Sequence, residues 1–215
     1  MIPLLQLEAL TVTVIVFVLT LVLTLIMTGS YLRGRKSSTL FWSLGMWSFT
    51  IGVLLEILFA LGIYSEPLIA LYLFIVAILV EFLALGSMQL IQSKKLKQIY
   101  YVYCILSTIF VAYSLIATKI TNFILNYIAY GNPPLLVIYS SSFVTFPAAA
   151  ILIIIAAKSY LQKKSYKTLS IILGVVIVSI AGTLYIVQFP SLLYAAEFIG
   201  ILLLWAGFYS PRPKK

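Results

Sequence analysis

The sequence contains no histidine and no aspartate, and Cys104 is its single cysteine. Without histidine, a bis-histidine haem, a His-bearing zinc site and a Ser-His-Asp triad are excluded. One cysteine cannot form an internal disulfide, so cysteine usage does not report the redox compartment. We therefore expect no cofactor and no enzymatic activity. A lipid-modifying enzyme that relies on Glu, Tyr and Ser alone is the weakest alternative.

Charge is scarce as well. Charged residues make up 9% of the 215 residues, hydrophobic residues make up 63%, and the mean hydropathy is +1.16. A soluble domain of this size has too little interior to bury so much apolar surface. We expect the chain to lie in a membrane, where a helical span needs about 20 apolar residues to cross roughly 30 Å of hydrocarbon.

Seven apolar segments, bounded by charged residues, Pro, Gly or Asn, are long enough to span a bilayer. Helix is the expected form, because lipid offers no hydrogen-bond partner to an open strand edge. The sequence predicts an all-α integral membrane protein with a single domain, residues 1–215, and seven transmembrane helices. These cover residues 7–32, 40–63, 68–91, 99–117, 135–157, 168–187 and 191–209.

The basic residues predict the orientation. Of the 14 Lys and Arg residues, all but Lys119 lie in the loops after the first, third and fifth segments or in the C-terminal tail. The positive-inside rule places these loops and the C-terminus in the cytoplasm and the N-terminus outside. The net charge of +9 then reflects topology and contact with anionic lipid headgroups, not nucleic-acid binding. The compact, loop-poor build suggests a prokaryotic cytoplasmic membrane. Tyr100, Tyr101 and Tyr103 are expected in an aromatic belt at the inner face of that membrane.

Three of the five glutamates fall inside predicted spans. At 1.5 Å per residue, Glu56 and Glu197 lie roughly 10 Å below the outer ends of their spans, and Glu81 lies roughly 20 Å deep. An ionised carboxylate at such a depth costs at least about 2.5 kcal/mol, and no Lys or Arg lies inside any span. We expect these groups to point inward and either to be protonated or to face water.

Small residues accompany the three glutamates and mark surfaces where membrane helices approach closely. They are Gly45, Gly52 and Ala60 near Glu56, Ala77 and Ala84 near Glu81, and Gly200 near Glu197.

Two further segments are distinctive. Pro147 interrupts the fifth span, where it frees a backbone carbonyl and predicts a kink. The preceding hydroxyl groups, Ser140, Ser141, Ser142 and Thr145, could satisfy that carbonyl or line a cavity. The longest predicted outer loop, residues 118–134, carries apolar residues at helical spacing. It is either a short helix on the outer surface or a plain connector.

Seven spans with an outer N-terminus resemble the topology of microbial rhodopsins and of the SWEET sugar transporters. A rhodopsin needs a lysine in its last span, and LLYAAEFIGILLLWAG contains none, which excludes a retinal Schiff base. The Pro-Gln signature of SWEET proteins is also absent, because VQFP has the wrong order. Pro67 and Pro190 each lie just before a span, the third and the seventh, and a tyrosine, Tyr72 or Tyr194, follows soon after. Seven spans with an outer N-terminus allow a three-plus-one-plus-three duplication.

Two functions remain open. The leading hypothesis is an outward-facing cavity that binds or transports a proton, a cation or a small amphipathic ligand. Its candidate residues are Glu56, Glu81, Glu197, Ser141 and Thr145, and no metal site is expected. The alternative is a non-catalytic accessory subunit that packs against a membrane-protein partner in a larger complex.

Overall fold

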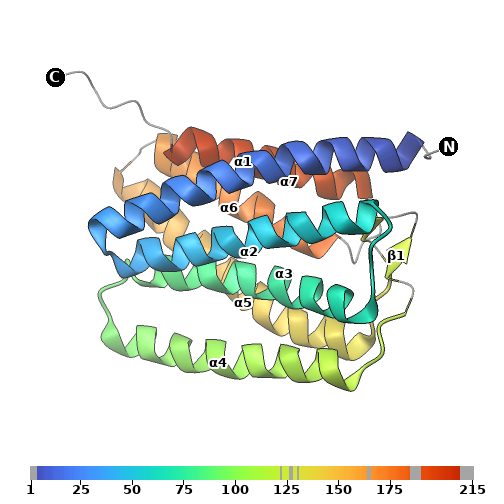
Figure 1. The fold of residues 1–215 in the computed structure, drawn as a ribbon. Helices are drawn as coiled ribbons and strands as arrows, with labels where there is room; N and C mark the ends of the chain where they lie inside the picture. The colour runs from blue at the N-terminus through green and yellow to red at the C-terminus, as the bar shows by residue number, and fades with distance from the viewer. Residues whose placement is uncertain are drawn as a thin grey trace.

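The computed structural model describes residues 4–121, 123–125, 128–129, 131–163, 166–184 and 190–208. These residues form seven helices and one two-stranded antiparallel hairpin (Figure 1). The elements are α1 (Leu4–Gly34), α2 (Ser37–Ala60), α3 (Glu66–Met88), α4 (Lys94–Ala117), β1 (Ile124–Leu125), β2 (Ile128–Ala129), α5 (Leu135–Lys163), α6 (Tyr166–Leu184) and α7 (Pro190–Phe208). The all-α prediction is therefore confirmed apart from this small hairpin.

Length and composition identify a membrane protein. Within the described ranges, α1 to α5 are each long and apolar enough to cross a bilayer, whereas α6 and α7 contain shorter apolar stretches. Large apolar side chains also cover the outer face of α4, which is the expected surface for contact with lipid. They include Val102, Ile105, Leu106, Ile109 and Ile116.

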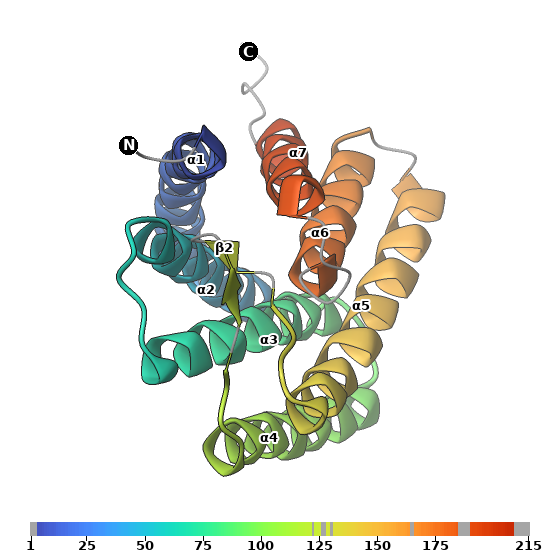
Figure 2. The same ribbon diagram turned by 90° about the vertical axis from the view of Figure 1, so that its right-hand side faces the viewer.

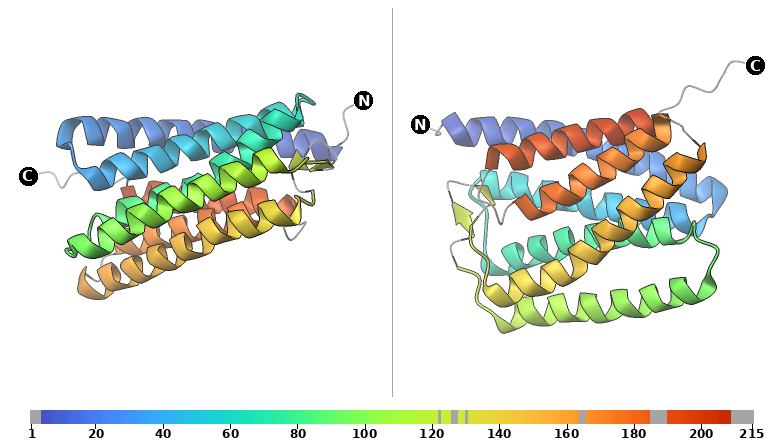
Figure 3. Two further views of the ribbon diagram at one scale, coloured as in Figure 1. Left: turned by 90° about the horizontal axis from the view of Figure 1, so that it is seen from below. Right: turned by 180° about the vertical axis from the view of Figure 1, so that it is seen from behind.

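Six helices form a closed ring in the order α1, α2, α3, α5, α6 and α7, in which each helix packs against its two neighbours. α4 lies outside this ring and packs against α3 and α5 (Figures 2 and 3). The helices therefore divide into two triplets, α1–α3 and α5–α7, with α4 between them in the chain. This arrangement is compatible with a three-plus-one-plus-three order, and a duplication stays a prediction. The triplets meet along an α3–α5 seam and an α1–α7 seam.

The bundle has two ends that differ in charge. The end of α1, the start of α4 and the end of α5 lie at one end of the bundle (Figure 1). This end carries Arg33 in the last turn of α1, Arg35 and Lys36 in the loop after it, and Lys94 and Lys95 in the first turn of α4. We call this the basic end. Lys119 and Glu66 lie at the other end, which we call the hairpin end because β1 and β2 cover it.

Glycines set the closest helix contacts, as the sequence predicts for Gly45 and Gly200. A Cβ at Gly45 would lie 2.9 Å from Leu83 of α3, and one at Gly200 would lie 2.6 Å from Val178 of α6. Gly174 faces Gly200 across the α6–α7 contact, where an added Cβ would lie 2.9 Å from the Gly200 carbonyl oxygen. Close backbone approach is a main source of packing energy in lipid, where the hydrophobic effect between helices is absent.

The carbonyl freed by Pro147 finds a partner that the sequence analysis did not predict. Pro147 lies inside the continuous helix α5, and its missing N–H leaves the carbonyl of Phe143 without an intrahelical donor. The hydroxyl of Tyr103 on α4 donates to this carbonyl, and the two aromatic rings lie 5.3 Å apart. No bond from Ser141 or Thr145 to this carbonyl is observed.

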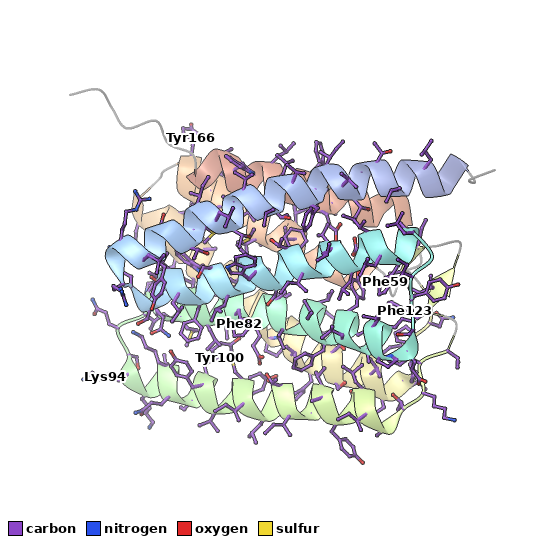
Figure 4. All side chains as sticks on the ribbon, in the orientation of Figure 1. Phe59, Phe82, Lys94, Tyr100, Phe123 and Tyr166 are labelled. Atoms are coloured by element: carbon purple, nitrogen blue, oxygen red, sulfur yellow. The ribbon has the colours of Figure 1, made fainter. Side chains whose placement is uncertain are left out.

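The loop between α4 and α5 is not a surface helix. Its described residues include the hairpin, and Ile120, Phe123 and Ile128 are buried. Figure 4 shows Phe123 at this end of the bundle. Gly131 N donates to the Phe123 carbonyl at 2.7 Å, and Ile120 N donates to Glu66 Oε1 at 3.0 Å. The apolar side chains are therefore used to seal the end of the bundle. Asn122, Asn126 and Tyr127 of this loop lie outside the described residues.

Tyr100, Tyr101 and Tyr103, which the sequence predicts at the inner face of the membrane, make contacts within the protein. Tyr100 is buried, and its ring stacks on Tyr103 with a centroid distance of 6.0 Å. The hydroxyl of Tyr101 accepts a 2.6 Å hydrogen bond from Gln89, at the end of α3. These three tyrosines pack within the protein because α4 turns this face toward α3 and α5.

Candidate functional site

Glu81 points from α3 toward α4, outside the ring of six helices. Its side chain is 4% exposed. The hydroxyls of Ser107 and Thr108 donate to Oε1 and Oε2 at 2.6 and 2.7 Å, so each carboxyl oxygen has a partner. Glu81 lines neither of the two cavities described below. Its geometry is that of a polar link between two membrane helices, and the sequence analysis missed both of its partners.

Glu56 lies inside the ring, toward the hairpin end. Its side chain is 4% exposed, and the hydroxyl of Tyr72 on α3 donates to Oε1 at 2.6 Å. Tyr72 in turn packs edge-on against Phe59 and lies 6.1 Å from the Phe123 ring. Figure 4 shows Phe59 and Phe123 together at this end of the bundle. The hairpin thus packs over the residue that orients Glu56.

Glu197 of α7 meets Glu56 across the ring. The two side chains line one small cavity of about 10 Å³, which is completed by residues of α2 and α3. Glu197 is 5% exposed, and Oε2 of each glutamate is buried without a hydrogen-bond partner. Their similar predicted depths, roughly 10 Å, anticipate this pairing. The structure therefore brings together two of the three predicted glutamates and separates Glu81 from them.

Ser141 and Thr145 are buried on α5 but do not line the cavity between Glu56 and Glu197, nor the larger cavity described next. Ser141 Oγ is buried without a partner. The neighbouring Ser140 pairs with Ser114 of α4 at 2.6 Å. Of the hydroxyl groups on α5, Ser140 therefore serves the α4–α5 contact.

A larger cavity, of about 290 Å³, lies inside the ring at the basic end. All six ring helices contribute to its wall. The lining residues are Met27, Trp42, Met46, Leu83, Ser87, Leu90, Leu152, Ile155, Ala156, Ser159, Ile171, Val175 and Leu204. No sequence motif marks this cavity, because its lining contains no ionisable group.

The wall of the basic-end cavity is apolar except for a few hydroxyl and indole groups. Trp42 Nε1 donates to Ser87 Oγ at 3.3 Å, and Ser159 supplies a second hydroxyl. Gly86 makes this arrangement possible, since a Cβ there would lie 2.2 Å from Trp42 Cδ1. Mostly apolar walls with a few placed polar groups are typical of small-molecule sites, whose volumes begin at about 300 Å³.

Among the described residues, no three metal-ligating side chains gather in one place. Comparisons with protein-family models, with curated proteins and with solved structures find no match to this chain. The two cavities are therefore the features of this structure that point to a function.

Proposed function

We propose that this chain is a seven-span membrane protein whose basic-end cavity binds a small amphipathic ligand with an anionic head. The outer N-terminus and cytoplasmic C-terminus follow from the positive-inside rule, so the cavity faces the cytoplasm. The observation that carries the proposal is the apolar cavity of about 290 Å³ inside the ring. The proposal keeps the amphipathic ligand expected from the sequence, but its site is the basic-end cavity and not the small cavity that Glu56 and Glu197 line toward the hairpin end.

Charge at the basic end supports an anionic head. Arg33, Arg35, Lys36, Lys94 and Lys95 are exposed at this end, and Lys158 is exposed beside the lining residue Ser159. A cation near the membrane surface attracts an anionic group by about 1 kcal/mol. An apolar tail in the cavity and a carboxylate or phosphate among these side chains would use both features.

Tryptophan fluorescence offers a direct test. In a Trp47→Phe, Trp205→Phe background, Trp42 is the only tryptophan left, and it lines the cavity. Bromodecanoate, a heavy-atom quencher with an anionic head, is expected to quench Trp42 saturably in detergent-solubilised protein. An uncharged brominated alkane should bind more weakly, because it lacks the head.

Ala156 and Ala157 provide a matched pair of variants on α5. Ala156 lines the cavity, whereas Ala157 is exposed on the outer face. Ala156→Leu should weaken bromodecanoate binding at least about tenfold, which is about 1.4 kcal/mol, and Ala157→Leu should leave it unchanged. Equal effects of the two variants, or quenching without saturation, would overturn the proposal. Native mass spectrometry that finds an obligatory hetero-complex would favour the accessory-subunit alternative.

A further inference from the structure

We propose that Glu56 and Glu197 form a proton-binding site in which the two carboxyl groups share a single proton. The site lies inside the ring toward the hairpin end and is separate from the basic-end cavity, so it does not depend on the ligand proposed above. It joins α2 of the first triplet to α7 of the second.

No described residue that lines this site is positively charged. Besides the two glutamates, the cavity is lined by Ser48, Phe49, Gly52, Val53, Val76 and Leu79, none of which carries a charge. Tyr72 is the titratable group that reaches the pair from α3, and its hydroxyl already donates to Glu56. Two like charges that share a buried site cannot both be present without a large electrostatic penalty, so at least one proton stays bound.

Two carboxyl oxygens of the pair are buried without a hydrogen-bond donor. Glu56 Oε1 has Tyr72 as a donor, but Oε2 of Glu56 and Oε2 of Glu197 have no protein partner although both are buried. A buried polar atom without a partner costs free energy. The cavity of about 10 Å³ is about the size of one water molecule. One proton held between the two oxygens, directly or through one water, satisfies both of them.

The size of the site also argues against a metal cation. Sodium and calcium need several oxygen ligands, and Ca²⁺ takes at least about six. The cavity offers the two carboxyl groups and the hydroxyl of Ser48. A proton needs only two acceptors, and it is the ligand that fits.

Infrared spectroscopy can count the proton. In a Glu8→Gln, Glu81→Gln variant, Glu66 is the only glutamate besides the pair, and it is exposed. The protonated carboxyl C=O band at neutral pH, calibrated against the same sample acidified until all carboxyl groups are protonated, should equal one group. Adding Glu56→Gln and Glu197→Gln should abolish it, and adding Glu66→Gln should leave it unchanged. A count of zero or of two groups in the starting variant would overturn the proposal.

Stability against pH gives a second measurement that needs no band assignment. Glutamates of the unfolded chain ionise above about pH 4.3, whereas the folded pair keeps one proton. The folded state therefore binds more protons, and the unfolding equilibrium constant should rise by up to about tenfold per pH unit above that value. In the same background, the midpoint temperature should fall with rising pH, and Glu56→Gln with Glu197→Gln should remove this fall. An unchanged pH slope, or a midpoint that sodium raises at fixed pH, would contradict a shared proton.

Discussion

Ser107 of α4 donates a 2.6 Å hydrogen bond to Glu81 of α3, deep between two helices that otherwise contact each other sparingly. Thr108 occupies the second carboxyl oxygen. Ser107 Oγ also lies 2.9 Å from the Tyr103 carbonyl oxygen, which is another acceptor for its single proton. The glutamate that the sequence places deepest is thus the one most fully engaged by hydroxyl groups.

Glu81 is expected to matter for stability and not for binding at the basic-end cavity. Glu81→Gln keeps a polar side chain between Ser107 and Thr108 and should change the midpoint temperature little. Glu81→Ala removes two hydrogen bonds at about 0.6 kcal/mol each, so a loss on the order of 1 kcal/mol is expected. Thermal unfolding and bromodecanoate titration measure the two effects. A selective loss of bromodecanoate binding in Glu81→Gln would show that this residue belongs to the binding site.

The bond between Tyr103 and Phe143 predicts a specific double-mutant coupling. Tyr103→Phe deletes the donor to the Phe143 carbonyl and should destabilise the protein by about 0.6–2 kcal/mol. Pro147→Ala restores an N–H that can serve the same carbonyl, so Tyr103→Phe should cost clearly less in that background. The midpoint temperatures of the four proteins in the cycle measure the coupling. Equal costs in both backgrounds would mean that Tyr103 acts through packing alone.

The α6–α7 contact should be sensitive to added side-chain volume, because an added Cβ at Gly174 would meet backbone atoms of α7. Gly174→Ala and Gly200→Ala each place a Cβ within 2.9 Å of atoms on the partner helix, and each should destabilise by about 1–3 kcal/mol, the usual cost of overpacking. Gly29→Ala is the matched control, because nothing lies within 4 Å of its added Cβ. It should be neutral or slightly stabilising, since Ala favours helix over Gly by about 1 kcal/mol. Similar midpoint temperatures for the three variants would argue against this close contact.

Gly86→Ala is expected to change the basic-end cavity, although Gly86 itself is not one of the lining residues. The new Cβ would lie 2.2 Å from Trp42 Cδ1, so the indole must move and its bond to Ser87 is lost. In the background with Trp42 alone, the emission maximum should shift and the affinity for bromodecanoate should fall. An unchanged spectrum with unchanged affinity would show that Trp42 does not pack where the structure places it.

Sequence patterns predicted the architecture better than the site. The apolar segments defined the helices, because membrane spans are set by length and hydropathy. The small residues Gly45 and Gly200 marked true helix contacts, because close approach needs a missing side chain. The partners of Glu81 and of the Phe143 carbonyl were not predictable, since they depend on how α4 is rotated against α3 and α5. The basic-end cavity depends on the whole ring, and its apolar residues look like ordinary core.

The position of α4 has a mechanical consequence. It is fastened to α3 through Glu81 and to α5 through the Tyr103–Phe143 and Ser114–Ser140 bonds, so it ties the two triplets together along their α3–α5 seam. On the far side, Trp205 of α7 donates to the Leu19 carbonyl of α1 across the other seam. If the two triplets separate, we expect the α3–α5 seam, held by α4, to act as the hinge. The α1–α7 seam should then be the side that opens.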